Sequence, residues 1–140
     1  MNLEQANLQI GAYRENDQIL DAAHYLIRNF NLEHENFAGF DFRNELKSDG
    51  LLLTAEGELG EPQTVKIPRN LFDFNLDLVL NMVAHEMLHV RQKDPNSLVE
   101  DKNEREFQAY YEMLFHKVFP QIPELSPFYI KQFGEKALEY

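Results

Sequence analysis

Hydrophobic residues recur along the N-terminal part of this chain at intervals typical of helices. The pattern runs through residues 3–13 and resumes after Asn16, continuing to residue 30. It predicts two amphipathic helices, or one helix interrupted near Gly11. Asn16 is the expected N-cap of the second part, because its side chain can accept a free N–H of the first turn.

From residue 36 the interval changes to two, which is the period of a strand. Residues 37–42 form the first such segment, and Leu51–Thr54 and Thr64–Ile67 follow as two further short segments. Asp49-Gly50 is a turn signal that separates the first segment from the second. These segments predict a small antiparallel sheet.

Three further helices are predicted in the second half of the chain. The longest apolar stripe runs from Asn75 to Gln92 with few charges, so this helix should be buried. Ser97–Glu100 has the capping-box pattern and begins a second helix, which continues to about Phe119. Ser126-Pro127 begins a last helix. The whole pattern predicts one α+β domain that spans residues 1–140.

Composition narrows the possible partners and ligands. The chain has 140 residues, 44% of them hydrophobic, and a formal net charge of -11. Such an acidic chain repels nucleic acid and anionic membranes. It has no cysteine, so any metal must be held by histidine and carboxylate groups. Without a signal segment or an apolar run of about 20 residues, it is expected to be a cytoplasmic protein.

The helix expected from Asn75 to Gln92 contains the motif His85-Glu86-Met87-Leu88-His89, which is HExxH. Residues four apart share a helix face, with Cβ atoms roughly 5–6 Å apart, so both imidazoles can bind one ion. Glu86 lies about 100° further round the helix, where its carboxylate can reach a metal-bound water. We therefore predict zinc (Zn2+) on His85 and His89, with Glu86 as the general base.

A catalytic zinc site usually has a third protein ligand. Carboxylates on the next helix are better placed than the other histidines, because a short loop returns that helix antiparallel to the first. The candidates are Glu100, Glu104, Glu106 and Glu112, and, with less support, His24, His34 and His116. Glu106 is preferred because Ala109 is small enough to let the two helices approach, and Glu104 is its rival.

The HExxH motif, followed by Glu106-Phe107-Gln108-Ala109 on the next helix, resembles the gluzincin metallopeptidases. The resemblance implies a zincin-like fold with zinc on His85, His89 and Glu106. Gluzincins often have an acidic residue four positions after the third ligand, where this chain has Tyr110. The small size is similar to that of the minigluzincins, which implies that residues after Pro120 can lie near the cleft and inhibit it.

The predicted function is therefore a zinc-dependent hydrolase, a peptidase acting on peptide or protein substrates. Candidates for a hydrogen-bond donor to the oxyanion are Tyr110, Tyr111 and His116. Substrate is expected to pair with an edge strand of the sheet. Two alternatives stay open: a non-catalytic binding protein of zincin fold with structural metal or none, and an acidic helical interaction module with an accidental motif.

Overall fold

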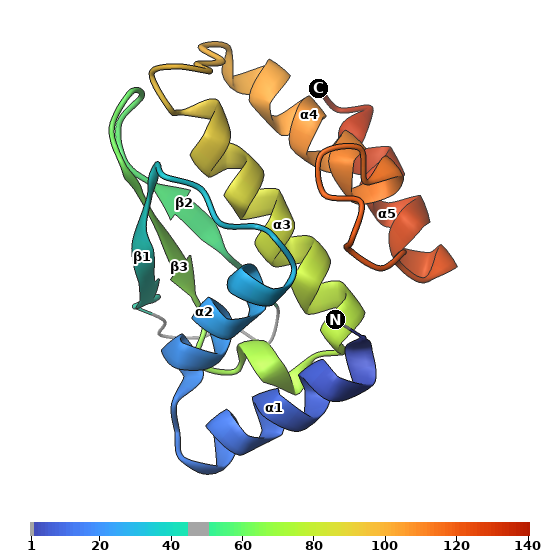
Figure 1. The fold of residues 1–140 in the computed structure, drawn as a ribbon. Coiled ribbons are helices and arrows are strands. Elements are labelled where there is room, and N and C mark those ends of the chain that lie inside the picture. Colours follow the sequence, from blue (N-terminus) through green and yellow to red (C-terminus); the bar gives the residue numbers. More distant parts are fainter. Residues whose placement is uncertain (1, 45–50) are drawn as a thin grey trace.

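The computed structural model describes residues 2–44 and 51–140. Its elements are α1 (Leu3–Glu15), α2 (Ile19–Asn29), β1 (Phe37–Phe42), β2 (Thr54–Glu56), β3 (Gln63–Ile67), the 3-10 helix η1 (Leu71–Asp73), α3 (Leu76–Gln92), α4 (Lys102–Phe115) and α5 (Pro127–Ala137). Helix α3 runs through the middle, with the sheet on one side and α4 and α5 on the other (Figure 1). The α+β class is confirmed. No helix in the described ranges has the length and apolar content needed to cross a membrane.

The N-terminal helices form a pair, and Gly11 lies inside α1. The prediction for Asn16 was wrong, because this residue is the C-cap of α1. Its backbone N–H donates to the carbonyl of Tyr13, and Asp17 follows with a φ of 55°. The chain therefore turns over these residues, and Gln18 becomes the N-cap of α2.

The sheet is mixed, so the prediction of an antiparallel sheet was wrong. The strand order is β1-β3-β2, with β3 parallel to β1 and antiparallel to β2. The chain passes from β1 to the far edge and returns through a hairpin into the centre, which makes β3 parallel to β1. The second strand begins at Thr54 instead of Leu51. Leu53, the residue before it, is buried in the core and is not part of the strand. The predicted turn at Asp49-Gly50 lies outside the described residues.

The loop between β2 and β3 is fastened to the end of α3. The Lys93 ammonium donates to the carbonyl of Gly57 at 3.2 Å, and the N–H of Gly60 donates to the carbonyl of Lys93 at 2.8 Å. Gly57 has a φ of +151°, and a Cβ there would lie 2.6 Å from the Gln63 amide nitrogen. A residue without a side chain is therefore favoured at this close approach within the loop, and the hydrogen bonds to Lys93 hold the loop at the end of α3.

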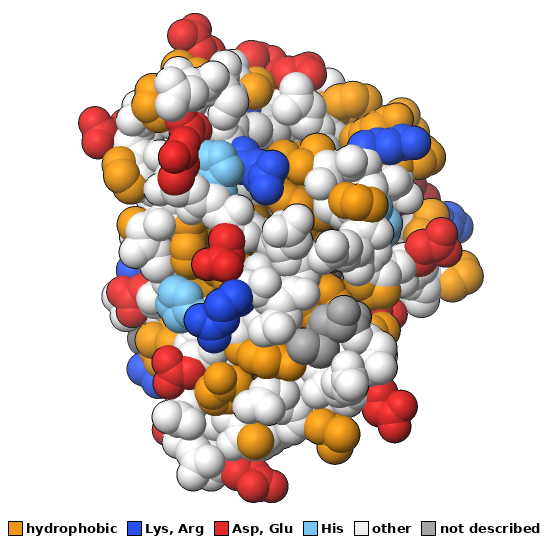
Figure 2. All heavy atoms as spheres, viewed as in Figure 1, with side chains coloured by type: hydrophobic (Ala, Val, Ile, Leu, Met, Phe, Trp, Pro, Cys, Tyr) orange, Lys and Arg blue, Asp and Glu red, His pale blue; other side chains and the backbone are white. Residues whose placement is uncertain are grey.

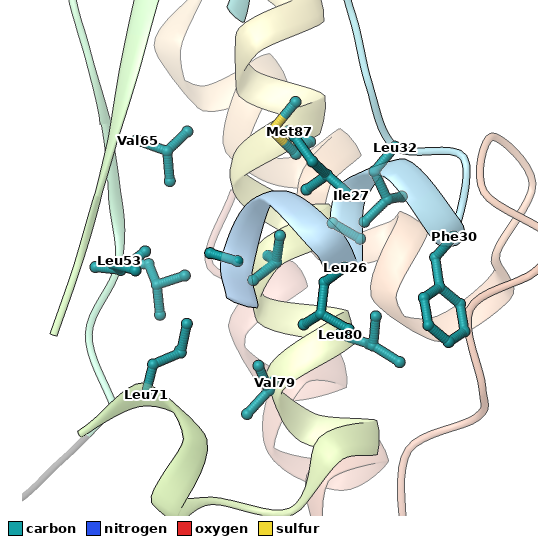
Figure 3. Packing of buried hydrophobic residues seen from close by; sticks show 14 of the residues in the cluster. Leu26, Ile27, Phe30, Leu32, Leu53, Val65, Leu71, Val79, Leu80 and Met87 are labelled. Carbon is teal, nitrogen blue, oxygen red and sulfur yellow. The ribbon is translucent and has the colours of Figure 1, made fainter. Parts of the chain in front are cut away.

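The core lies between α3, α2 and the sheet (Figure 3). Val79, Leu80 and Met87 of α3 are fully buried there, against Leu26 and Ile27 of α2. Burying a side chain of this size stabilises the fold by roughly 1.5–3 kcal/mol. A second buried cluster, formed by Leu78, Met113 and Leu125, joins α3 to α4 and to the segment before α5. Both sides of α3 are therefore covered, which fixes its position.

Helix α4 starts later than the capping-box pattern predicts. Its N-cap is Asp101, whose carboxylate accepts the N–H of Glu104 at 3.0 Å. The residues at 97–100 are held outside the helix, because the N–H of Val99 donates to the carbonyl of Gln92 at 2.8 Å. The capping box at Ser97–Glu100 was therefore a wrong prediction, and the loop between the two helices is longer than expected.

The end of α4 also differs from the prediction. The helix ends at Phe115 and not near Phe119, because His116 adopts a left-handed conformation with a φ of 48°. The buried carboxylate of Glu112 accepts the N–H groups of residues 117–119 at 2.9–3.0 Å, which stabilises the turn. The predicted start of α5 is confirmed, with Ser126 as N-cap.

Candidate metal centre

Three side chains from two helices converge on one point. His85 and His89 lie one turn apart on α3, with ring centroids 4.9 Å apart. The Glu106 carboxylate of α4 lies 3.0 Å from Nε2 of His89 and 3.9 Å from Nε2 of His85. One ligand atom from each residue lies within 4.8 Å of the other two. This group, which contains the two histidines of the HExxH motif and the preferred carboxylate candidate, can hold a metal ion.

The approach of α4 to α3 brings Glu106 within reach. Ala109 is completely buried, so α4 comes close to α3 at the position where a larger side chain would hold them apart. Glu106 lies one turn before Ala109 and therefore faces α3 as well. The small residue anticipated from the sequence thus occurs at the contact that positions the third ligand.

A chain of side-chain hydrogen bonds orients His89. Its Nδ1 lies 2.8 Å from Oε1 of Gln92, while the amide nitrogen of Gln92 donates to the Arg105 carbonyl and to the Gln108 side chain. Since the Gln92 oxygen can only accept, Nδ1 of His89 must donate the proton. Nε2 is therefore the nitrogen that faces Glu106, and it can bind a metal when it is not protonated.

His85 lies in a more apolar environment. Its Nδ1 is 3.1 Å from the sulfur of Met113, and its ring packs edge-on against Tyr110 with centroids 4.7 Å apart. A thioether sulfur is only a weak acceptor. The ring is thus held mainly by packing, with its Nε2 toward Glu106.

The two histidines titrate in opposite directions. Burial, followed by the neighbouring His89, lowers the pKa of His85 to about 3. Burial also disfavours the charged form of His89, but the hydrogen bond to Glu106 and the nearby carboxylates outweigh it and raise its pKa. The same hydrogen bond lowers the pKa of Glu106. The contact between His89 and Glu106 therefore favours the charged form of each, whereas burial favours the neutral form of His85.

Glu86 is the buried carboxyl group beside the three ligand candidates. It is 6% exposed, and its Oε2 lies 4.0 Å from Nε2 of His85. Burial raises the pKa of Glu86 to about 7, although His89 and the backbone of Ala55 act in the opposite direction. The group therefore changes its protonation state near neutral pH, as a general base requires.

These groups line a cleft of about 560 Å³ between α3, α4 and β2. Thr54, Ala55 and Glu56 of the edge strand β2 form one wall. The lining at one end is basic and consists of Lys93, Lys102 and Arg105. Met82, Tyr110 and Phe133 add apolar and aromatic lining, together with Leu52 and Leu53, and a fourth basic residue, Arg43, lines the cleft where it donates to Thr54 at the start of β2.

The other predicted ligand candidates do not join the group. Glu104 accepts a hydrogen bond from Gln108, Glu112 binds backbone N–H groups beyond α4, and Glu100 is exposed in the loop. The histidines are used elsewhere: His24 packs on Phe37 and Phe40, His34 accepts the N–H of Asn36, and His116 bonds to Asn81. Glu106 is the carboxylate that the structure brings to the two HExxH histidines.

Of the three candidates for an oxyanion donor, only Tyr110 lines the cleft. Burial, followed by the charge of Glu106, raises the pKa of Tyr110 to about 12, so its hydroxyl stays protonated. Tyr111 is exposed and packs with Phe107 and Phe115 on another face of α4. His116 is held by Asn81 at 2.7 Å.

Sequence reasoning missed the groups that support the ligands. Gln92 lies three residues after His89, and this i,i+3 spacing is a signal that could have pointed to it. Gln108 and Met113 gave no comparable signal, because their roles depend on how α4 packs against α3. The hydrogen bond that orients His89 thus comes from the Gln92 amide on α3, and position 110 holds a tyrosine.

Comparison of the chain with known protein families, with curated proteins and with solved structures found no match. The function must therefore be inferred from the chain's own residues. What those residues establish is a buried group of His85, His89 and Glu106 that can hold a metal ion in an α+β domain.

Proposed function

We propose that this chain is a zinc-dependent hydrolase, a peptidase of zincin-like fold. The observation that carries the proposal is the convergence of His85, His89 and Glu106 in a cleft that also contains the buried carboxyl group of Glu86. A structural ion would need no titratable carboxyl group next to it. A hydrolytic site needs one within reach of the attacking water.

The donor set favours zinc. Two imidazole nitrogens and one carboxylate oxygen are the ligands of many catalytic zinc sites, in which a fourth position stays open. The ligands lie at a cleft, which leaves solvent and substrate access to that position. When bound, zinc polarises a carbonyl oxygen and lowers the pKa of its bound water.

Two residues of the chain provide the acid–base chemistry in this proposal. The Glu86 carboxylate accepts a proton from the attacking water and returns it to the leaving amine, a role that matches its raised pKa of about 7. The hydroxyl of Tyr110 remains protonated and can donate a hydrogen bond to the oxygen that gains negative charge.

The position of β2 supports a peptide as the substrate. β2 is an edge strand that pairs with β3 on one side only, and its three residues line the cleft. An extended peptide can add to such an edge through main-chain hydrogen bonds. Its carbonyl groups would then pass the group formed by His85, His89 and Glu106.

The test combines metal analysis with a substitution of Glu86. Protein purified without chelator is expected to contain about one zinc per chain. Glu86→Gln is expected to keep the zinc and lose peptidase activity, since glutamine cannot accept the proton. Equal activity of the two proteins on a casein or quenched-peptide substrate would exclude Glu86 as the base.

The same measurements separate the proposal from its alternatives. Zinc without hydrolysis of any substrate would indicate a non-catalytic binding protein. Absence of zinc from protein reconstituted with the metal would indicate that the HExxH motif is accidental.

A further inference from the structure

Basic residues gather at one end of the cleft of this acidic protein. Lys93, Lys102 and Arg105, here called the basic cluster, line the cleft beside the metal centre. The whole chain has 24 acidic and 13 basic residues. On the face drawn in Figure 2, by contrast, acidic side chains are spread over the surface and its edge, and basic ones occur in small separate groups. Three cations at one end of the cleft therefore give this site a local positive charge in a protein whose net charge is negative.

Hydrogen bonds to main-chain carbonyls hold two members of the basic cluster in place. The Lys93 ammonium donates to Gly57, and the Arg105 guanidinium donates to Val99 at 2.9 Å and to Glu100 at 2.8 Å. These carbonyl oxygens fix the side chains but do not neutralise their charge. The two positive groups are therefore oriented at the cleft without the flexibility of surface side chains.

The two cations are also close enough to repel each other. Burial, followed by the charge of Arg105, lowers the pKa of Lys93, although Glu58, Glu86 and Glu106 act in the opposite direction. Within residues 2–44 and 51–140, the ion pairs found do not include any member of the basic cluster. An added anion would relieve this repulsion.

The acidic residues of the cleft are engaged with other groups. Glu106 binds His89 at 3.0 Å, and Oε2 of Glu56 accepts the hydroxyl of Thr54 at 2.8 Å. Glu86 lies next to His85, at a distance of 4.0 Å. The positive charge at this end of the cleft is thus available to a ligand.

Helix geometry gives the offset between the backbone positions of Lys93 and of the ligand candidate His89. Lys93 lies four residues after His89, which corresponds to about 6 Å along the helix axis. An extended peptide advances about 3.3 Å per residue, so this offset corresponds to roughly two residues. Arg105 precedes Glu106 and lies at the same end. Arg43, the fourth basic residue of the lining, lies apart from the basic cluster, because it donates to Thr54 at the start of β2 whereas Lys93 donates to Gly57 after the end of β2.

We propose that the basic cluster binds a carboxylate of the substrate, so that the protein selects peptides with an acidic group about two residues from the metal centre. The carboxylate comes from a Glu or Asp side chain or from the C-terminus of the peptide. The selection of the bond that is cleaved rests on the proposed hydrolase function, whereas binding of the carboxylate does not depend on it.

The binding test uses three labelled octapeptides with a central Phe. The first carries Glu on both sides of the Phe and is amidated, the second has Gln in place of Glu, and the third is the Gln peptide with a free C-terminal carboxylate. Fluorescence anisotropy gives the affinity for zinc-loaded Glu86→Gln protein, in which cleavage does not interfere. The Glu peptide is expected to bind roughly tenfold more tightly than the amidated Gln peptide, the scale of one charge-assisted hydrogen bond.

Substitutions in the same Glu86→Gln background assign the effect to the basic cluster. Adding Lys93→Gln together with Lys102→Gln is expected to abolish the preference, while Lys131→Gln, which removes an exposed charge on α5, is expected to preserve it. Thermal unfolding checks that each variant is folded. Tighter binding of the free-carboxylate peptide alone would identify the C-terminus as the source. Equal affinity for all three peptides, or no binding, would overturn the proposal.

Cleavage by the wild-type protein separates this proposal from the proposed function. Equal rates for the Glu and Gln peptides would overturn the carboxylate preference and leave the hydrolase intact. Selective binding of the Glu peptide without cleavage of any peptide would support the basic cluster and contradict the hydrolase.

Discussion

His85 and His89 lie one turn apart on α3, yet the regions around them differ. Around His89 the groups are polar, and the hydrogen bonds continue through Gln92 and Gln108. Around His85 they are a methionine sulfur and the ring of Tyr110. We call these the polar region and the apolar region of the centre.

The difference separates two requirements of a metal site. The polar region fixes which nitrogen of His89 carries the proton and the direction of its ring. The apolar region keeps His85 neutral by burial, with its pKa lowered to about 3. Of the two histidines that can bind an ion, His89 is thus oriented by hydrogen bonds, and His85 is kept in its neutral form by desolvation.

The largest expected effect comes from the carboxylate that joins the two regions. Glu106→Ala is expected to lower zinc affinity by more than the roughly 10–100-fold typical of losing a supporting hydrogen bond, because it removes a ligand. Glu100→Ala is the matched control, since the Glu100 side chain is exposed in the loop before α4 and lies outside the ligand group. Competition with a chromogenic chelator measures both. Equal affinity in wild type and Glu106→Ala would remove Glu106 from the ligand set.

Zinc removal is expected to destabilise the whole domain. An ion that binds only the folded chain adds about 2.7 kcal/mol to the free energy of unfolding when present at 100 times its dissociation constant. Thermal or urea unfolding with zinc and with EDTA measures this difference. The Glu106→Ala protein is expected to show little zinc-dependent stabilisation. A wild-type protein whose stability does not change with zinc would contradict the proposed metal site.

A comparison of substitutions in the polar and apolar regions comes next. Gln92→Ala removes the acceptor of the His89 proton and is expected to weaken zinc binding by about 10–100-fold. Met113→Leu keeps the volume beside His85 and is expected to leave zinc affinity nearly unchanged. Its expected cost in the free energy of unfolding is less than about 1.5 kcal/mol. Equal losses of zinc affinity would show that the two regions do not have separate roles.

Periodicity and motif spacing were sufficient to predict most of what lies on α3. The apolar stripe indicated the helix, and HExxH indicated two histidines that can bind one ion and a neighbouring carboxyl group, because these relations are local. The structure places Glu106, and not Glu104, beside the two histidines, on the face of α4 that the small Ala109 indicated.

What the sequence did not predict depends on contacts between distant segments. The parallel pairing of β1 with β3 arises from the order of strands, which alternation does not encode. Helix α4 begins after Asp101 and not at the predicted capping box, because the N–H of Val99 donates to the carbonyl of Gln92. The basic cluster was missed for the same reason: Lys93 and Arg105 belong to different helices and meet only through the fold.

A smaller effect is expected from the glycine at the close approach within the loop between β2 and β3. Gly57→Ala is expected to cost about 1–3 kcal/mol, because its φ is positive and the new Cβ would meet the side chain of Gln63. Gly60→Ala is the control: its φ is +83°, and nothing lies within 4 Å of the added Cβ. Urea unfolding measures the stability of both variants. An equal loss of stability would mean that the positive φ alone, and not the contact with Gln63, causes the destabilisation.

The smallest expected effect concerns the apolar region and the end of the chain. Tyr140 stacks on Tyr110, with ring centroids 6.0 Å apart and planes 13° apart. We expect Tyr140→Ala to raise kcat/KM slightly, because it uncovers a cleft-lining ring without removing a core residue. Leu138→Ala is the control, since Leu138 is 86% exposed.

Deletion of residues 125–140, which would test whether the C-terminal segment inhibits the cleft, is less informative than Tyr140→Ala. It also removes Leu125, which is buried with Leu78 and Met113, so lost activity could reflect unfolding. Tyr140→Ala avoids this ambiguity if its melting temperature equals that of Leu138→Ala. A rise in kcat/KM specific to Tyr140→Ala would then mean that the chain end restricts the apolar region. Equal rates in both variants would mean that the stacked ring leaves access to the cleft unchanged.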